Sequence, residues 1–136
     1  MRRFLVLFVA LGLGLASVAL TTGALAASAG QRHKLVIYFA SWAADVDENA
    51  AKVIDEAAKW SADHPRDTIN VVGYASTIGS KRANALLSDL RAQVVVDQLI
   101  ARGVPATRVK RQTKGATTYV ESPLESRRVE ISMHLK

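Results

Sequence analysis

Cysteine is absent from the 136 residues, and histidine, aromatic residues and proline are few. Without cysteine the chain can form no disulfide and no thiolate metal site, and it has no thiol nucleophile. The three histidines, His33, His64 and His134, lie far apart in the sequence. Since a metal site takes several such ligands, we expect no metal and no cofactor.

Charged residues are absent from Phe4 to Ala27, a run that follows the basic residues Arg2 and Arg3. A short basic start, an apolar run and small residues at its end are the layout of a secretory signal peptide. We therefore predict a signal peptide over residues 1–26, followed by a linker over residues 27–34. The alternative is an uncleaved membrane anchor, because the apolar run is about long enough to cross a bilayer.

Acidic residues are outnumbered by basic ones, 12 against 18, and the net charge is +6. A basic surface indicates an anionic partner. Export argues against nucleic acid, and the aromatic residues do not alternate with the basic ones as they do on nucleic-acid-binding surfaces. We expect a partner in the cell envelope, with the protein in the periplasm near the outer membrane or cell wall. Membrane contact would come only through the N-terminal segment, if it stays uncleaved.

Apolar periodicity predicts one domain over residues 35–136, with four strands and two helices. The strands are expected at residues 35–39, 68–74, 108–115 and 127–135, and the helices at about 46–64 and 80–102. Right-handed crossovers would place both helices on one face of the sheet. The prediction is therefore an α+β fold, a two-layer α/β sandwich of order β-α-β-α-β-β with a mixed sheet.

The second predicted helix has an apolar face that should lie against the sheet. Its expected members are Ser88, Ala92, Val95 and Leu99, broadened by Leu87, Leu90 and Val94. Gly103 is typical of the left-handed residue that ends a helix.

The chain has no recognisable catalytic group, and we expect that it is not an enzyme. Its serines lack an evident histidine and acid partner. Asp45, Asp47 and Glu48 are typical of a helix start, where the helix dipole favours acids. Trp60 is expected in the core. Trp42 either covers the edge of the core, which we favour, or lines a groove and stacks on sugar or peptide.

The loop from Tyr74 to Gly79 separates the second strand from the second helix, which is a common place for a ligand. Asn84 and Arg91 lie two turns apart on one face of that helix. Because helical side chains lean toward the N-terminus, Arg91 can reach back toward the loop and bind a carboxylate with two parallel hydrogen bonds. The alternative is that Arg91 caps a neighbouring carbonyl or stays in water.

The stretch "GYASTIGSKRANALLSDLRAQVVVDQLIARGV" at residues 73–104, with Gly115 and "SRRVEI" at residues 126–131, resembles the OmpA C-terminal domain family. This module is shared with Pal lipoproteins and MotB stators. The resemblance covers about residues 35–136. It implies a periplasmic module that binds the diaminopimelate stem peptide of peptidoglycan without covalent chemistry.

The resemblance also implies a set of ligand-binding residues. In the family a loop aspartate binds the ligand ammonium, and a helix arginine binds a carboxylate. By matching position, the implied site consists of Arg91, Asn84, Ser76 and Arg127 or Arg128. The loop adds Tyr74, Thr77 and Gly79 as candidate ligand-binding residues.

Ser76 stands at the position of the family's aspartate, and Ala40 also replaces an aspartate. Losing a charged partner for the ammonium would cost about 1.5–3 kcal/mol of binding. We therefore expect weakened or altered specificity for peptidoglycan. The alternative is an envelope protein-interaction or structural module that has lost peptidoglycan binding.

Overall fold

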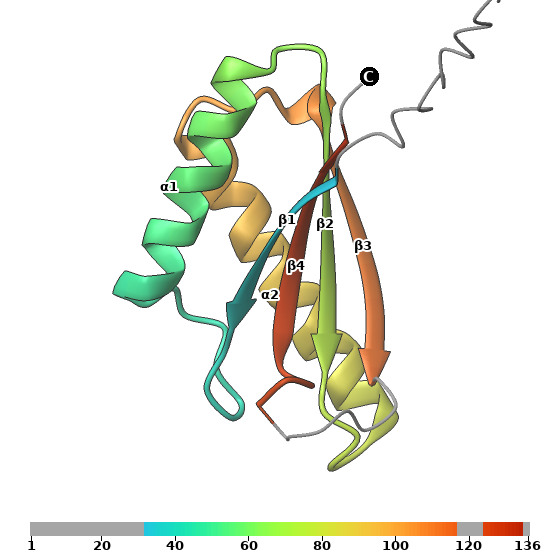
Figure 1. Cartoon of the computed structure of the whole chain (residues 1–136). Coiled ribbons are helices and arrows are strands. Elements are labelled where there is room, and N and C mark those ends of the chain that lie inside the picture. The colour runs from blue at the N-terminus through green and yellow to red at the C-terminus, as the bar shows by residue number, and fades with distance from the viewer. Residues whose placement is uncertain (1–31, 117–123, 135–136) are drawn as a thin grey trace, which may run out of the picture.

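The computed structural model describes residues 32–116 and 124–134. These residues form four strands, two α-helices and a short 3₁₀ turn (Figure 1). In chain order they are β1 (Arg32–Tyr38), α1 (Glu48–Asp63), β2 (Thr68–Ala75), α2 (Lys81–Ala101), the 3₁₀ turn η1 (Ala106–Arg108), β3 (Val109–Ala116) and β4 (Arg128–His134). The predicted order β-α-β-α-β-β is confirmed. The predicted signal peptide or anchor lies outside the described residues.

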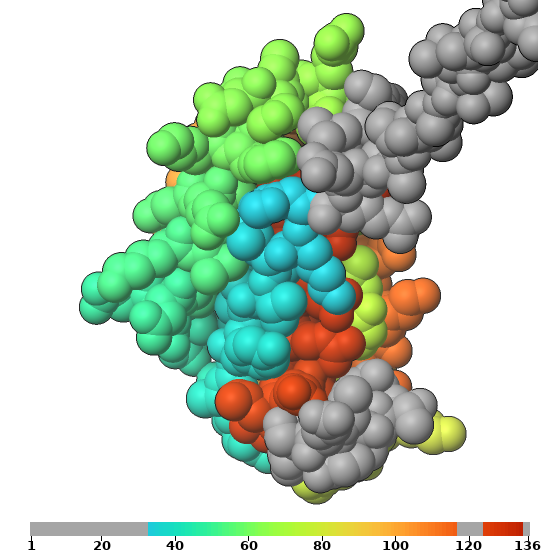
Figure 2. All heavy atoms as spheres, viewed as in Figure 1, coloured from blue at the N-terminus to red at the C-terminus, as the bar shows by residue number. Residues whose placement is uncertain are grey.

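The four strands form one mixed sheet in the order β1-β4-β2-β3. Strand β4 runs antiparallel to both β1 and β2, whereas β3 runs parallel to β2. Both helices cover the same face of the sheet, which confirms the two-layer α/β sandwich (Figure 1). Figure 2 shows the opposite face, where atoms of β1 and β4 lie at the surface.

The core lies between the sheet and the two helices. Strand β4 shows the expected alternation, since Val129, Ile131 and Met133 are at most 1% exposed. Helix α1 contributes Ile54 and Ala57, which recur at helical spacing and are fully buried. Burial of a side chain as large as that of Ile54 stabilises the fold by about 1.5–3 kcal/mol, and burial of the Ala57 methyl group contributes less.

The helix ends follow from local sequence. Asp47 and Ser80 cap α1 and α2, because each side chain accepts a hydrogen bond from the backbone N–H three residues later, at 2.7 and 3.1 Å. Helix α2 ends at Ala101. Gly103, two residues later, has a φ of +91°, and the N–H of Val104 donates to the carbonyl of Leu99 at 3.1 Å. This is the predicted glycine-terminated end.

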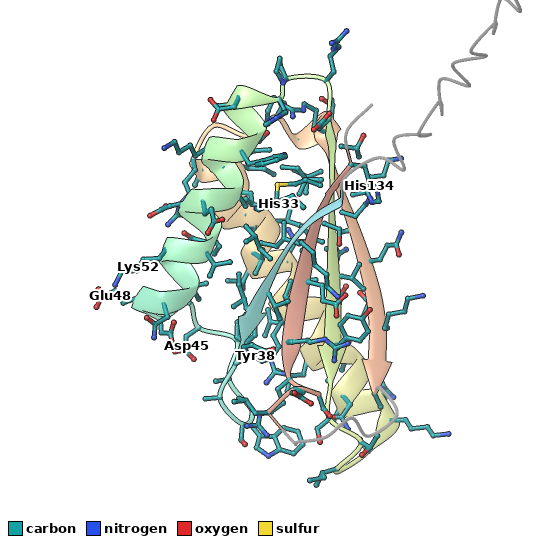
Figure 3. The ribbon with its side chains drawn as sticks, in the orientation of Figure 1. His33, Tyr38, Asp45, Glu48, Lys52 and His134 are labelled. Carbon is teal, nitrogen blue, oxygen red and sulfur yellow. The ribbon has the colours of Figure 1, made fainter. Side chains whose placement is uncertain are left out.

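The acidic residues before and within the first turn of α1 lie as expected. Figure 3 labels Asp45, in the loop before the helix, and Glu48, its first residue. Glu48 pairs with Lys52 one turn later, at 2.8 Å on the outer surface. An exposed pair at this spacing contributes only about 0.3–0.5 kcal/mol to stability.

Strand β1 begins at Arg32 rather than Leu35, because its first residues pair with the end of β4. His33 was expected in a linker but belongs to this strand. Its ring stacks on Trp60 with centroids 4.4 Å apart, and Trp60 stacks on His64 at 4.1 Å. Trp60 packs against the core as expected, so two of the histidines are brought together around it.

Helix α2 buries a face that is partly polar. Ser88, Ala92, Val95 and Leu99 are buried as predicted. The prediction that Leu90 widens this buried face is wrong, because Leu90 is 52% exposed. The buried face extends instead to Asn84 and Arg91, which are 2% and 0% exposed.

Helix α2 lies very close to β2 at Gly73. A Cβ atom placed on Gly73 would lie 2.1 Å from the backbone oxygen of Ser88 and 3.1 Å from the Cβ of Ala92. Only glycine allows this approach. The contact sets the position of α2 relative to the loop that follows β2.

Candidate functional site

A pocket of about 110 Å³ lies where the loops after β1 and β2 meet helix α2. Both loops extend from the same end of the sheet, because β1 and β2 run in the same direction (Figure 1). The side chains that line the pocket come from the two loops, from α2 and from the segment before β4; they are Ser41, Trp42, Ser76, Ile78, Asn84, Leu87, Arg91 and Arg127.

Arg91 is fully buried at the floor of this pocket. Its Nε donates to the carbonyl of Ala43 at 2.8 Å, and its Nη2 donates to the carbonyl of Ala40 at 3.0 Å. The guanidinium also lies 5.3 Å from the ring centroid of Phe39. Two of its nitrogens therefore hold the loop after β1 in place.

The third nitrogen of Arg91, Nη1, is buried and has no hydrogen-bond partner among the described residues. Burial, together with the nearby charge of Arg127, lowers the pKa of Arg91 to about 10. A buried cation with an unsatisfied donor is costly. An anion in the pocket would relieve both costs, because it would accept from Nη1 and offset the charge.

Asn84 and Ser76 fix the loop after β2. The Nδ2 of Asn84 donates to the carbonyl of Ile78 at 2.9 Å, and the Oγ of Ser76 accepts from the N–H of Ile78 at 3.1 Å. Gly79 follows with a φ of +94°, which favours glycine. The loop is thus held on both sides of Ile78, whose side chain is 67% exposed at the pocket mouth.

Trp42 forms the opposite wall of the pocket and is 65% exposed. The expectation that it covers the core is wrong. Its φ of +57° lies in the left-handed region, which is rare for a bulky residue. Its ring lies over Gly79, where a Cβ would be 3.1 Å from the ring edge. This conformation turns the indole away from the core and toward the loop after β2.

Two arginines bring positive charge to the pocket. Arg127 lines it beside Arg91, and the Nε of Arg127 donates to the carbonyl of Phe39 at 3.2 Å. Among the described residues that line the pocket, none is acidic. The site therefore suits an anionic group with apolar surroundings.

The structure brings together only part of the predicted site. Tyr74 and Arg128 lie on the helix-free face of the sheet, where the Arg128 guanidinium is 4.0 Å from the Tyr74 ring centroid and 2.7 Å from Glu130. Neither of them lines the pocket, so of the two candidates Arg127 and Arg128 it is Arg127 that belongs to the site. Thr77 is exposed and lies outside the lining, and Gly79 supports Trp42.

Sequence reasoning missed the apolar part of the lining. Ile78 and Leu87 line the pocket together with Ser41. The sequence could have indicated that Ile78 lines the pocket, because an isoleucine is unusual within a short loop of small and polar residues. Leu87 gave no such signal, because it has the same helical spacing as core residues.

The model of the OmpA family matches residues 38–129. The chain belongs to the OmpA family. This OmpA-family domain is 32% identical to the peptidoglycan-associated lipoprotein of Rhizobium meliloti, over 74% of this chain and 57% of the relative. It is 30% identical to the probable lipoprotein YiaD of Escherichia coli, over 71% of this chain and 47% of the relative. The domain thus spans about half the length of these relatives.

Solved structures share the fold of this OmpA-family domain. The peptidoglycan-associated lipoprotein of Burkholderia pseudomallei aligns with a TM-score of 0.67 at 21% identity, covering 73% of this chain and 89% of that one. The C-terminal domain of Helicobacter pylori MotB also aligns with a TM-score of 0.67, at 23% identity, covering 75% and 85%. Within residues 32–116 and 124–134, neither helix is long and apolar enough to span a membrane.

Proposed function

We propose that this chain is an exported, periplasmic domain that binds peptidoglycan non-covalently and catalyses no reaction. The observation that carries the proposal is the buried, unpartnered Nη1 of Arg91 at the floor of a pocket with no acidic residue among its described lining. A stem-peptide carboxylate is an anion of suitable size for this donor. The name of one relative, peptidoglycan-associated lipoprotein, supports the same ligand.

Several features support a binding role. The serines that line the pocket, Ser41 and Ser76, have no histidine or acid beside them in the described lining, so no activated nucleophile is formed. The pocket also has a polar floor and an apolar rim, as small-ligand sites commonly do. Relatives named as lipoproteins and outer membrane proteins support a location in the envelope.

The test is co-sedimentation of the exported protein with purified sacculi, together with calorimetric titration of a diaminopimelate-containing muropeptide. Arg91→Gln should lower the affinity about tenfold to a hundredfold, which corresponds to one charged hydrogen bond. Lys110→Gln is the matched control, because it removes the same charge from an exposed position on β3. Equal binding by the two variants would exclude Arg91 as the ligand-binding group.

Arg91 also holds the loop after β1, so Arg91→Gln can lose stability as well as binding. Thermal unfolding of each variant separates the two effects. Arg127→Gln provides a second test, because Arg127 lines the pocket and is only partly buried. A folded Arg127→Gln protein with unchanged affinity would argue against the pocket as the binding site.

A second function is favoured by exposed apolar residues. Ile78 lines the pocket and is 67% exposed, and Leu86 and Leu90, which are 64% and 52% exposed, lie one turn apart on α2. Apolar side chains exposed in this way are typical of protein-binding surfaces. This alternative predicts no binding to sacculi, and capture of one envelope protein that Leu86→Ser with Leu90→Ser abolishes.

A further inference from the structure

A second groove, of about 210 Å³, lies between β1 and the first half of α1. None of its lining residues belongs to the pocket that contains Arg91. The groove therefore offers a separate place for a ligand. Its lining comes from the end of the strand and the start of the helix; the residues are Val36, Ile37, Tyr38, Asp47, Asn49, Ala50 and Val53.

Strand β1 has unused backbone hydrogen-bonding groups beside this groove. Among the described strands it pairs with β4 alone, at the end of the sheet next to α1 (Figure 1). The N–H of Phe39 donates at 2.9 Å to the carbonyl of Arg127, the residue opposite it in this register. Since hydrogen-bonded pairs alternate along an antiparallel ladder, Val36 and Tyr38 direct their N–H and C=O groups away from β4. An extended peptide can add to such an edge as a further strand.

The groove would receive side chains from one face of the added strand. Ile37 and Ala50, which are 2% and 4% exposed, give the groove an apolar part together with Val53. At the start of the helix the lining changes to Asp47. Alternate residues of a strand share one face and lie about 7 Å apart. A peptide that fills both parts therefore has an apolar residue and, two positions away, a residue that faces Asp47.

The acidic residues at the helix start favour a basic side chain at that second position. One carboxylate oxygen of Asp47 accepts from a backbone N–H of the first turn at 2.7 Å, which leaves the other oxygen for a ligand. Among the described residues, neither Asp47 nor Asp45 in the preceding loop (Figure 3) forms an ion pair. The nearby Lys52 is paired with Glu48 at 2.8 Å. The charge at this end of the groove is thus complementary to a cation.

We propose that the free edge of β1 binds an extended peptide segment of a partner protein, in which an apolar residue and a lysine or arginine are two positions apart. The peptide backbone pairs with Val36 and Tyr38. Its apolar side chain lies against Val53, and its cation faces Asp47. Because the groove is separate from the Arg91 pocket, this function goes beyond peptidoglycan binding and does not depend on it.

The experiment is a nuclear magnetic resonance titration of the exported protein with a capped seven-residue peptide. The probe has leucine at the third position, lysine at the fifth and threonine elsewhere. We expect the amide signals of Val36 and Tyr38 to shift more than that of Ile37, whose N–H faces β4. A control peptide with leucine and lysine at adjacent positions should bind about tenfold more weakly, because its two side chains lie on opposite faces of the strand.

Asp47→Asn tests the charge, because asparagine also caps a helix. This variant should bind the lysine peptide about threefold to fivefold more weakly. It should bind a peptide with glutamine in place of lysine as the wild-type protein does. Asp63→Asn is the matched control, because it removes the same charge from an exposed position at the other end of α1. Equal affinity of the two variants for the lysine peptide would exclude Asp47 as the partner of the cation.

Val36→Pro tests the edge itself. Proline there removes an N–H that faces away from β4, so it should abolish peptide binding and leave muropeptide titration unchanged. Peptide binding that survives this substitution overturns the inference, as does the absence of shifts in β1 at about 1 mM peptide. A dimer of the wild-type protein that Val36→Pro dissociates would also overturn it, because a second copy would then occupy the edge. None of these results bears on peptidoglycan binding, which the muropeptide titration tests separately.

Discussion

The close approach of α2 to β2 at Gly73 gives the sharpest stability prediction. In Gly73→Ala the new methyl group would lie 2.1 Å from the backbone oxygen of Ser88, whereas real contacts of this kind are rarely closer than 3.0 Å. A backbone oxygen within a helix cannot rotate away as a side chain would. Helix α2 must therefore move outward by about 1 Å, and this opens the packing along the whole contact.

The cost can be estimated from overpacked cores, where an extra methylene typically destabilises by about 1–3 kcal/mol. The present clash is with backbone, so we expect at least about 3 kcal/mol. The matched control is Gly103→Ala, which has no atom within 4 Å of the new methyl group and suffers only the left-handed φ of +91°. That strain is worth about 1–2 kcal/mol.

The two variants are compared by urea unfolding and by ligand titration. Gly73→Ala should unfold at a lower urea concentration than Gly103→Ala and should also bind ligand more weakly, since α2 carries Asn84 and Arg91 into the pocket. Gly103→Ala should leave the affinity unchanged. If Gly73→Ala loses no more stability than Gly103→Ala, the argument from close packing is wrong.

Three further predictions address other parts of the molecule. Trp42→Gly should have a free energy of unfolding within about 1 kcal/mol of the wild-type value, because relief of the left-handed φ offsets the lost contact area. Ligand titration of the same variant should nevertheless show weaker binding. Arg108→Ala should destabilise by about 2 kcal/mol or more in urea unfolding, since it removes side-chain hydrogen bonds to three backbone carbonyls, of which the His64 carbonyl still accepts from the N–H of Asp67. Arg111→Ala, which breaks only an exposed ion pair, should cost less than about 1 kcal/mol. Burial alone would raise the pKa of Glu130, but hydrogen bonds from Arg128 and Lys34 outweigh this effect and hold the pKa below its usual 4.5. Glu130→Gln should therefore be less stable than the wild-type protein at pH 7. The two proteins should be equally stable once the pH falls below the pKa of Glu130 in the folded protein.

Local signals were sufficient for most of the fold. The alternation of Val129, Ile131 and Met133 in β4 and the glycine end of α2 depend on neighbours in sequence, and both were predicted correctly. The start of β1 was misplaced, because the residues around His33 become a strand only by pairing with the end of β4. That pairing joins the two ends of the domain and leaves no apolar periodic signal in the first residues of β1.

The site was only partly predictable, because its decisive contacts are long-range. The spacing of Asn84 and Arg91 predicted that both would face the loop after β2, and both line the pocket. The carbonyls that hold Arg91 come from Ala40 and Ala43, 51 and 48 residues away. For Trp42 the favoured interpretation was the edge of the core, but the alternative of a groove-lining position is the one the structure shows. Its left-handed backbone could not be inferred from the residue type.

Arg91 joins the two halves of the site. Its Nε and Nη2 fix the loop that carries Trp42, and its buried Nη1 has no hydrogen-bond partner among the described residues. Loop position and ligand affinity should therefore depend on one guanidinium, whereas Trp42 affects affinity alone. A bound carboxylate would satisfy the buried donor and raise the melting temperature of the wild-type protein by mass action. At the same concentration this ligand should raise the melting temperature of Arg91→Gln less, because that variant lacks the charge and binds more weakly.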